Sequence, residues 1–309
     1  MGEGNFLLSL SKFNISLHIL YRNNYENKSK NQVNNILYKT AKALLYHSPS
    51  ISKSTLCKIF GGKWIVISGA SHGIGKALAL KLIEAGADLF LIARTESELQ
   101  FLHDKARQNG CNVRISVTDL RNRNELDRLC SVLKELPRVD FFFCNAGKSI
   151  HRRIEDALDR MHDYDRTIDL NYKSLVALSL TLIPKLQQSG GKIIYTSSVS
   201  CLYPAAPGWS AYHASKCAAN IWCQTADSEL KHKGVRVQIA YMPLVHTTMS
   251  DATEMYRKLP AFSAEEAADI LLNLSISNKR CYKPWWASLT EIPAICLSPL
   301  IRKIYSLKK

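Results

Sequence analysis

Tyr212 and Lys216 are the residues whose types and spacing most directly suggest acid–base chemistry. They stand four positions apart in "AYHASKCAAN" (residues 211–220). Residues four apart lie on one face of a helix, so a phenol and an ammonium would be neighbours there. A phenol has a pKa of about 10, and a nearby positive charge favours the phenolate and lowers that pKa. The pair also fits an ordinary solvated helix face, so its interpretation depends on the rest of the chain.

A glycine-rich turn, "SGASHGIG" (68–75), is the second chemical feature. It stands between a β-branched run and a helical pattern. Glycines allow a tight turn and a close approach of a pyrophosphate, and the N-terminus of the following helix offers free N–H groups. We therefore predict a dinucleotide site, which in this turn contains Gly69, Ser71, His72, Gly73, Ile74 and Gly75.

The end of the second predicted strand bears on which dinucleotide binds. An Asp or Glu there would accept hydrogen bonds from the ribose 2′-hydroxyl and favour NAD. This chain has Ala93 and Arg94 instead. Because a guanidinium pairs well with a 2′-phosphate, we predict NADP, used as NADPH, with Arg94 as a contact. The alternative is an ordinary surface arginine.

The elements that must position these residues alternate along the chain. Short apolar runs predict strands, and the segments between them have helical patterns. This alternation predicts an α/β fold with a doubly wound, Rossmann-type parallel sheet. Strands are expected at 63–68, 88–94, 112–120, 139–147, 191–198 and 235–243, and helices at 73–86, 96–110, 123–136, 166–188 and 212–232.

The chain divides into three predicted regions. Residues 1–60 form an extension, with a flexible linker at 23–35 and a short amphipathic helix at 36–47. Residues 61–275 form the single nucleotide-binding domain. Residues 276–309 form an apolar, basic C-terminal segment, which we expect to associate with a membrane or with the substrate. The prolines of the stretch 284–301 argue against a membrane-spanning helix there.

The formal net charge of +15 is concentrated at the two ends of the chain. Residues 1–60 carry eight Lys or Arg against two acidic residues, and residues 279–309 carry seven against one. No nucleic-acid-binding motif is present, so we predict contact with an anionic membrane surface rather than nucleic acid. The nine cysteines include no C-x-x-C pair, which argues against a metal site or disulfides and predicts a cytoplasmic location.

Five motifs occur in an order that resembles the short-chain dehydrogenase/reductase family. They are "GASHGIG" (69–75), "NAG" (145–147), "LN" (170–171), "TSS" (196–198) and "YHASK" (212–216). The resemblance implies a carbonyl reductase that forms homo-oligomers. It implies a catalytic set of Asn171, Ser198, Tyr212 and Lys216. It also adds Asp119, near the adenine, and Asn145, Ala146, Gly147, Tyr212, Lys216 and Thr247 to the cofactor site.

Two departures from the family pattern are visible. Ser198 lies one position farther from Tyr212 than is usual, so Ser200 stays open as an alternative. Leu244 replaces the glycine that usually follows the last core strand, which makes Thr247 a less secure contact for the nicotinamide carboxamide.

The segments at residues 144–172, 239–249 and 262–271 are similar to bacterial fatty acyl-CoA reductases of the same family. This similarity implies NADPH-dependent reduction of a long-chain acyl thioester to the aldehyde. The alternatives are reduction of another lipid ketone, such as 3-ketosphinganine, and a non-catalytic nucleotide-binding role.

Some neighbouring residues have less decided roles. His151, Arg152 and Arg153 could meet a CoA phosphate or form an exposed polar loop. His213 is expected on a helix surface, and Cys217 is expected to pack between helices.

Overall fold

The computed structural model describes residues 28–251 and 253–307, which belong to two separate units, 1–47 and 48–309. The described part of the first unit is helix α2 (Lys28–Leu45). The helix expected at 36–47 is confirmed as the second half of α2. The linker expected at 23–35 is wrong from residue 28 onward, because that stretch contains no Gly or Pro to stop a helix; residues 23–27 lie outside the described residues.

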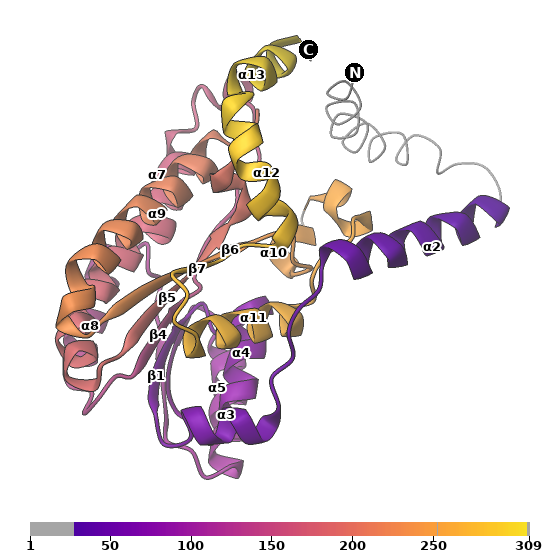
Figure 1. Cartoon of the computed structure of the whole chain (residues 1–309). Helices are drawn as coiled ribbons and strands as arrows, with labels where there is room; N and C mark the ends of the chain where they lie inside the picture. The colour runs from indigo at the N-terminus through magenta and orange to yellow at the C-terminus, as the bar shows by residue number, and fades with distance from the viewer. Residues whose placement is uncertain (1–27, 252, 308–309) are drawn as a thin grey trace. The chain divides into compact units, whose positions relative to one another are not determined.

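The larger unit is built on one parallel sheet, as predicted (Figure 1). Its seven strands have the order β3-β2-β1-β4-β5-β6-β7. The order reverses between β1 and β4, where Ser68 pairs with Cys144. The strands are β1 (Trp64–Ser68), β2 (Asp88–Ala93), β3 (Val113–Val117), β4 (Phe141–Cys144), β5 (Lys192–Ser198), β6 (Arg236–Met242) and β7 (Cys281–Tyr282).

Helices cover both faces of this sheet (Figure 1). One group of helices packs around α4, and the other contains α6, α7, α8 and α9. The first group is α3 (Lys53–Phe60), α4 (Gly73–Glu84), α5 (Glu96–Gln108) and α11 (Ala264–Ile276). The second is α6 (Arg123–Lys134), α7 (Met161–Ile168), α8 (Ser174–Ser189) and α9 (Ser210–Leu230).

The helix expected at 166–188 is longer than predicted. It begins as α7 at Met161, passes through the π-helical turn η2 (Asp169–Lys173) and continues as α8. Shorter turns complete the unit: η1 (Ile154–Ala157), η3 (Val199–Leu202), η4 (Lys231–Lys233), α10 (Thr248–Asp251) and η5 (Glu254–Lys258).

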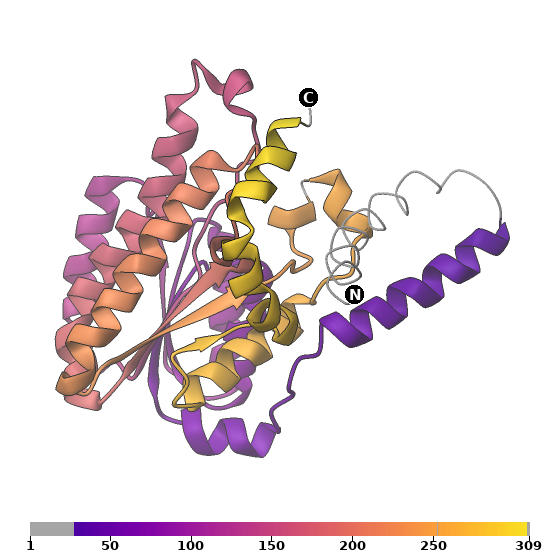
Figure 2. The same cartoon turned by 45° about the horizontal axis from the view of Figure 1, so that its top comes forward.

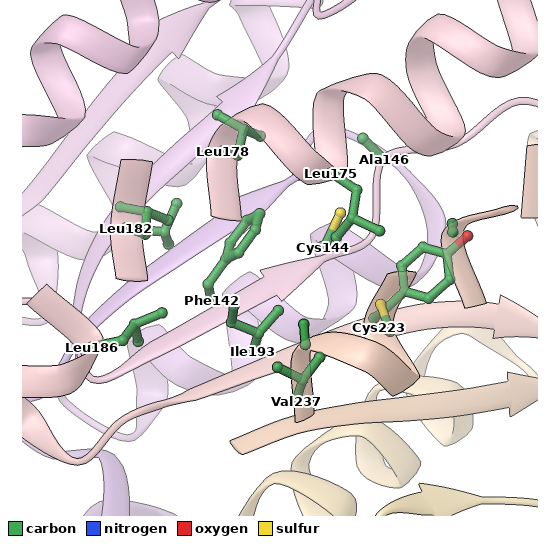
Figure 3. Close-up of a cluster of buried hydrophobic side chains, with 14 of the residues drawn as sticks. Phe142, Cys144, Ala146, Leu175, Leu178, Leu182, Leu186, Ile193, Cys223 and Val237 are labelled. Atoms are coloured by element: carbon green, nitrogen blue, oxygen red, sulfur yellow. The ribbon is translucent and has the colours of Figure 1, made fainter. Parts of the chain in front are cut away.

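One cluster of buried hydrophobic side chains lies between the sheet and the second group of helices (Figure 3). Strands covered on both faces read as continuous apolar runs, as in β4, where Phe142 and Phe143 are both buried. Leu178, Leu182 and Leu186 of α8 meet Phe142 at helical spacing. This packing fixes the strand ends that carry the candidate site.

The larger unit also includes residues on both sides of the predicted domain. Before residue 61, Leu56 and Phe60 of α3 are buried, and the Phe60 ring meets the edge of Phe141 with centroids 5.2 Å apart. After residue 275, β7 joins the sheet, and the fully buried Ala287 belongs to helix α12 (Trp285–Cys296). Helix α13 (Ser298–Leu307) follows.

The apolar stretch at 284–301 is divided between these two short helices. In the two described ranges, 28–251 and 253–307, no helix has both the length and the apolar character needed to cross a membrane.

Candidate active site

The candidate site lies at the carboxyl edge of the sheet, at the point where the strand order reverses. The turn after β1 and the segment after β4 meet there: Asn145 Nδ2 donates a 3.3 Å hydrogen bond to the Gly69 carbonyl, and the Ala146 N–H donates one of 3.2 Å to Ser68 Oγ. Open α/β sheets bind ligands at such switch points. The structure therefore brings two of the predicted motifs into direct contact.

The glycines of the turn are required by close backbone contact. A Cβ on Gly75 would lie 2.1 Å from the Gly69 carbonyl oxygen and 2.8 Å from Asn145 Nδ2. Gly73 has a φ of +52°, and a Cβ there would lie 2.8 Å from Thr247 Cγ2. The same contact places Thr247 beside the glycine turn.

The start of α4 has groups suited to an anion. The turn residues His72 and Ser71 pair with each other, with His72 Nδ1 2.9 Å from Ser71 Oγ, and no side chain caps the helix. The first turn of α4 contains no acidic residue, so its N–H groups and helix dipole can receive a phosphate. Ile74, in the same turn, is half-buried.

Arg94 is exposed directly after β2, at the same edge of the sheet. Asp119 follows β3. A hydrogen bond from Arg121 lowers the pKa of the Asp119 carboxyl, and the positive charge of Arg94 lowers it further. Arg121 also forms an ion pair with Asp119. Asp119 thus has a strong partner within the chain, which the sequence pattern did not indicate.

Asn171 lies in the π-helical turn between α7 and α8 and is buried, at 1% exposed. Its Oδ1 accepts a 2.8 Å hydrogen bond from the Lys148 N–H, while its Nδ2 donates to the Lys148 carbonyl and to Ser215 Oγ. Single π turns occur frequently at functional sites. Here the turn ties the segment after β4 to α9.

Lys216 is buried on α9, at 6% exposed. Its Nζ donates a 2.9 Å hydrogen bond to the Thr196 carbonyl and lies 4.8 Å from the centre of the Tyr195 ring. Burial lowers the pKa of this ammonium. A Cβ on Gly147 would lie 3.4 Å from Lys216 Nζ and 3.2 Å from Asn171 Oδ1, so these three residues meet.

Tyr212 and Ser198 are in direct contact, through a hydrogen bond between their side chains. Tyr212, Lys216 and Ser198 therefore lie close together, as the four-residue helix spacing and the position of Ser198 at the end of β5 predict.

The prediction that the chain's own residues lower the Tyr212 pKa is wrong. Burial raises the pKa of Tyr212 to about 12, and the hydrogen bond with Ser198 opposes this rise. The Lys216 ammonium is directed at the Thr196 carbonyl instead. The physical reason is that the desolvation of a phenolate outweighs the neighbouring dipoles.

Residues 63–257 match the short chain dehydrogenase family. The chain belongs to this family. It is accordingly an oxidoreductase with a dehydrogenase/reductase fold.

Named relatives agree with this assignment. A fatty acyl-CoA reductase of Acinetobacter baylyi is 39% identical over 68% of this chain and 72% of that protein. A fatty acyl-CoA reductase of Mycobacterium tuberculosis is 34% identical over 67% of this chain and 71% of that protein. A short-chain dehydrogenase from Sphingobium yanoikuyae, solved in complex with NADPH, superimposes with a TM-score of 0.67 at 25% identity, over 80% of this chain and 96% of that one.

The two candidate serines of this family member, Ser198 and Ser200, have different hydrogen-bond partners. Ser198 Oγ accepts hydrogen bonds from both the N–H and the hydroxyl of Ser200, at 3.2 Å and 2.9 Å. Ser200 therefore acts as a hydrogen-bond donor to Ser198. The hydroxyl that pairs with Tyr212 is that of Ser198.

The departure at Leu244 is accommodated by pairing with a later segment. The Leu244 carbonyl accepts from the Phe262 N–H, and the His246 N–H donates to the Phe262 carbonyl. This short parallel bridge holds the chain after β6 and brings Thr247 to Gly73.

An aromatic cluster beside Tyr212 was not predicted from the sequence. The Trp209 ring lies 5.8 Å from that of Tyr212, 6.1 Å from that of Tyr256 and 4.6 Å from that of His151, centre to centre. His213 is buried next to Trp209, so its expected surface position is wrong. The cluster draws on three separate segments, and only the closeness of Trp209 to Tyr212 in the sequence could have indicated it.

The basic loop after β4 is largely engaged in ion pairs. Arg152 and Arg160 both bind the buried Asp163, and Arg153 pairs with Glu155. Arg152 and Arg153 are thus held by carboxylates, while His151 belongs to the aromatic cluster.

No cysteine of the chain forms a disulfide. All nine cysteines are free thiols, and the described residues contain no group of three or more His, Cys, Asp or Glu that could hold a metal ion. Cys217 is exposed rather than packed between helices, so that expectation is wrong. Its thiol is hydrogen-bonded to Cys201, which lowers the Cys217 pKa.

Proposed function

We propose that this oxidoreductase uses NADPH to reduce a long-chain acyl thioester, fatty acyl-CoA, to the fatty aldehyde. The observation that carries the proposal is the contact of Tyr212 with Ser198 beside the buried Lys216, at the sheet edge that also holds the glycine turn.

The residues at the glycine turn fit NADPH. The missing Cβ atoms of Gly69 and Gly75 let this turn pack tightly against itself and against the segment after β4. The uncapped start of α4 favours the negative charge of a pyrophosphate. Exposed Arg94 suits the 2′-phosphate. Two solved family members, each 25% identical to this chain, were obtained with NADPH and NADP and support this choice. When bound, the cofactor supplies the hydride.

The chain's own residues would then handle the substrate oxygen. The Ser198 hydroxyl donates a hydrogen bond to the carbonyl oxygen, and the Tyr212 hydroxyl gives its proton to that oxygen as hydride arrives at carbon. The hydroxyl of the resulting hemithioacetal then loses its proton, and its C=O bond forms as the C–S bond breaks. The departing CoA sulfur takes up a proton, which leaves the aldehyde and the CoA thiol. A protonated Tyr212 suits this direction, because burial keeps its pKa high.

Lys216 and Asn171 have positioning roles in this proposal. Lys216 holds the ribose hydroxyls and supplies positive charge near the phenol as the proton leaves. Asn171 fixes the Lys148 backbone and the Ser215 hydroxyl around it, and supports a water that connects Lys216 to solvent.

The choice of an acyl substrate has two supports. The relatives named fatty acyl-CoA reductases cover about two thirds of the chain, and the cluster around Trp209 gives the site an aromatic wall. The aromatic wall would fit the hydrocarbon chain of a lipid ketone as well as that of an acyl thioester. Reduction of a lipid ketone is therefore the second candidate function.

The test is product analysis with purified full-length protein. NADPH and palmitoyl-CoA should yield palmitaldehyde and free CoA thiol. NADPH oxidation with 3-ketosphinganine but not with palmitoyl-CoA would favour the ketone reductase. Cofactor binding with no turnover across a broad panel of carbonyl compounds, indistinguishable from a Tyr212→Phe variant, would favour the non-catalytic alternative.

We also propose a cytoplasmic homo-oligomer. Leu180 of α8 and Ile221 of α9 are 60% and 63% exposed, so both helices present apolar side chains to a second copy. The free thiols agree with a reducing compartment. Light scattering on the purified protein and on a Leu180→Lys/Ile221→Lys variant tests the oligomer: a loss of mass in the variant supports it.

A further inference from the structure

Helices α12 and α13 expose an unusual amount of apolar surface. Six of their large aliphatic side chains are 45–73% exposed. The spacing is helical on both elements, with residues three apart on α12 and three or four apart on α13. These residues, here called the C-terminal apolar row, are Leu289, Ile292, Ile295, Leu300, Ile304 and Leu307.

The charges around the C-terminal apolar row are mainly positive. Residues 292–309 contain four basic residues and no acidic ones. Arg302 and Lys303 are exposed on α13, and Lys303 stands between Leu300 and Leu307 on successive turns. The nearest acidic residue, Glu291, forms an ion pair with Lys283. An apolar row with basic residues beside it suits an interface helix on an anionic bilayer, with lysine and arginine at the headgroups.

A second exposed apolar group differs in charge. Ile154, Leu158 and Met161 are 63–85% exposed, but the same segment contains Glu155, Asp156 and Asp159. Arg152, Arg153 and Arg160 balance these acidic residues, so this segment has no net positive charge to attract anionic lipid. The charge pattern therefore selects the C-terminal apolar row as the membrane-facing surface.

The row is linked through α12 to the edge of the sheet that holds the candidate site. The Tyr203 and Thr290 hydroxyls are 2.7 Å apart, which links α12 to the residue after η3. Turn η3 itself begins directly after Ser198, and α12 packs against it. Both views show α12 and α13 rising from the end of the sheet to which β5 and β6 point (Figures 1 and 2).

We propose that the C-terminal apolar row docks this enzyme on the surface of an anionic phospholipid bilayer, with the mouth of the site beside that surface. Long-chain acyl substrates partition into such bilayers, so docking would deliver them directly to Tyr212. The purpose of the docking rests on the proposed function, but the binding itself does not.

The test is co-sedimentation of full-length protein with vesicles of phosphatidylcholine, with or without phosphatidylglycerol, in the absence of substrate. The variant Leu289→Gln/Ile292→Gln removes two members of the row. The matched control, Phe101→Gln/Val132→Gln, alters exposed apolar residues of α5 and α6. We expect vesicle affinity to rise with phosphatidylglycerol, to fall at least about tenfold in the row variant and to stay unchanged in the control, since the two row side chains lose their favourable burial in the bilayer.

Two outcomes would overturn the proposal. One is equal vesicle binding by wild type and the row variant. The other is a wild-type dimer that ignores vesicles and becomes monomeric in the row variant, which would assign the row to a second copy of the chain. Vesicle binding by a protein with no reductase activity would reject the proposed function while leaving the docking surface in place.

Discussion

The Lys216 ammonium donates a 2.9 Å hydrogen bond to the carbonyl oxygen of Thr196. Thr196 lies on β5, two residues before Ser198, so this bond joins the helix that carries Tyr212 to the strand that carries the serine. The Lys216 ammonium therefore has a backbone carbonyl, rather than the Tyr212 phenol, as its hydrogen-bond acceptor. The catalytic set is thus assembled by contacts between elements and not by the helix spacing alone.

The variant Tyr212→Phe should lose at least about a hundredfold in kcat, since general acid catalysis contributes that much or more. The ring and its packing on Trp209 are kept, so the Kd for NADPH should stay within about twofold of wild type by fluorescence titration. Tyr256→Phe is the control: it removes the hydroxyl of another tyrosine whose ring stacks on Trp209, and it should keep most of its activity. Equal losses in the two variants would contradict the acid role of Tyr212.

The variant Arg94→Ala should weaken NADPH binding while leaving NADH binding unchanged. A charge-assisted hydrogen bond contributes about 1.5–3 kcal/mol, which corresponds to about a ten- to hundredfold increase in the Kd for NADPH. Arg107→Ala, which removes an exposed arginine at the far end of α5, should change neither constant. A parallel loss of NADH affinity in Arg94→Ala would show that this arginine supports the fold rather than reading the 2′-phosphate.

The variant Gly75→Ala should abolish NADPH binding, because its Cβ would lie 2.1 Å from the Gly69 carbonyl oxygen and force the turn open. Gly190→Ala is the matched control: its φ of +65° makes alanine strained, but nothing lies within 4 Å of the new Cβ. The control should lose about 1–2 kcal/mol of unfolding free energy and still bind NADPH. Circular dichroism and NADPH titration distinguish the two effects, and normal NADPH binding by Gly75→Ala would refute the close contact.

The variant Asp163→Asn should destabilise the protein by about 2 kcal/mol at neutral pH, because it removes a buried carboxylate that binds Arg152 and Arg160. Burial alone would raise the pKa of Asp163, but the hydrogen bonds from these arginines hold it below its ordinary value. A carboxyl with a lowered folded-state pKa stabilises the fold above its unfolded pKa, of about 4, and this stabilisation is lost as the pH falls further.

Thermal unfolding at several pH values measures this contribution. The gap in Tm between wild type and Asp163→Asn should be largest near neutral pH and should narrow as the pH falls below about 4. Asp127→Asn, at the exposed ion pair with Arg123, should change Tm little at any pH. A gap that is constant with pH would mean that the carboxylate charge does not stabilise the fold.

The amino-acid sequence by itself determined the order of the strands and helices and the sheet edge at which the motifs collect. Apolar runs flanked by helical patterns permit few arrangements other than a parallel sheet covered on both faces, and a glycine turn after β1 must lie at its carboxyl edge. Tyr212 and Lys216 share a face of α9 through local spacing alone. These features depend on neighbours in the chain, and periodicity records them directly.

The tertiary structure decided which groups the site residues contact. It paired Lys216 with Thr196 and placed Trp209 next to both His151 and Tyr256. It also paired Tyr212 with Ser198 rather than with Ser200. It also joined α12 to η3 through Thr290 and Tyr203, 87 residues apart in sequence. Such contacts, and the burial that raises the Tyr212 pKa, arise from segments distant along the chain, and no local pattern encodes their distances.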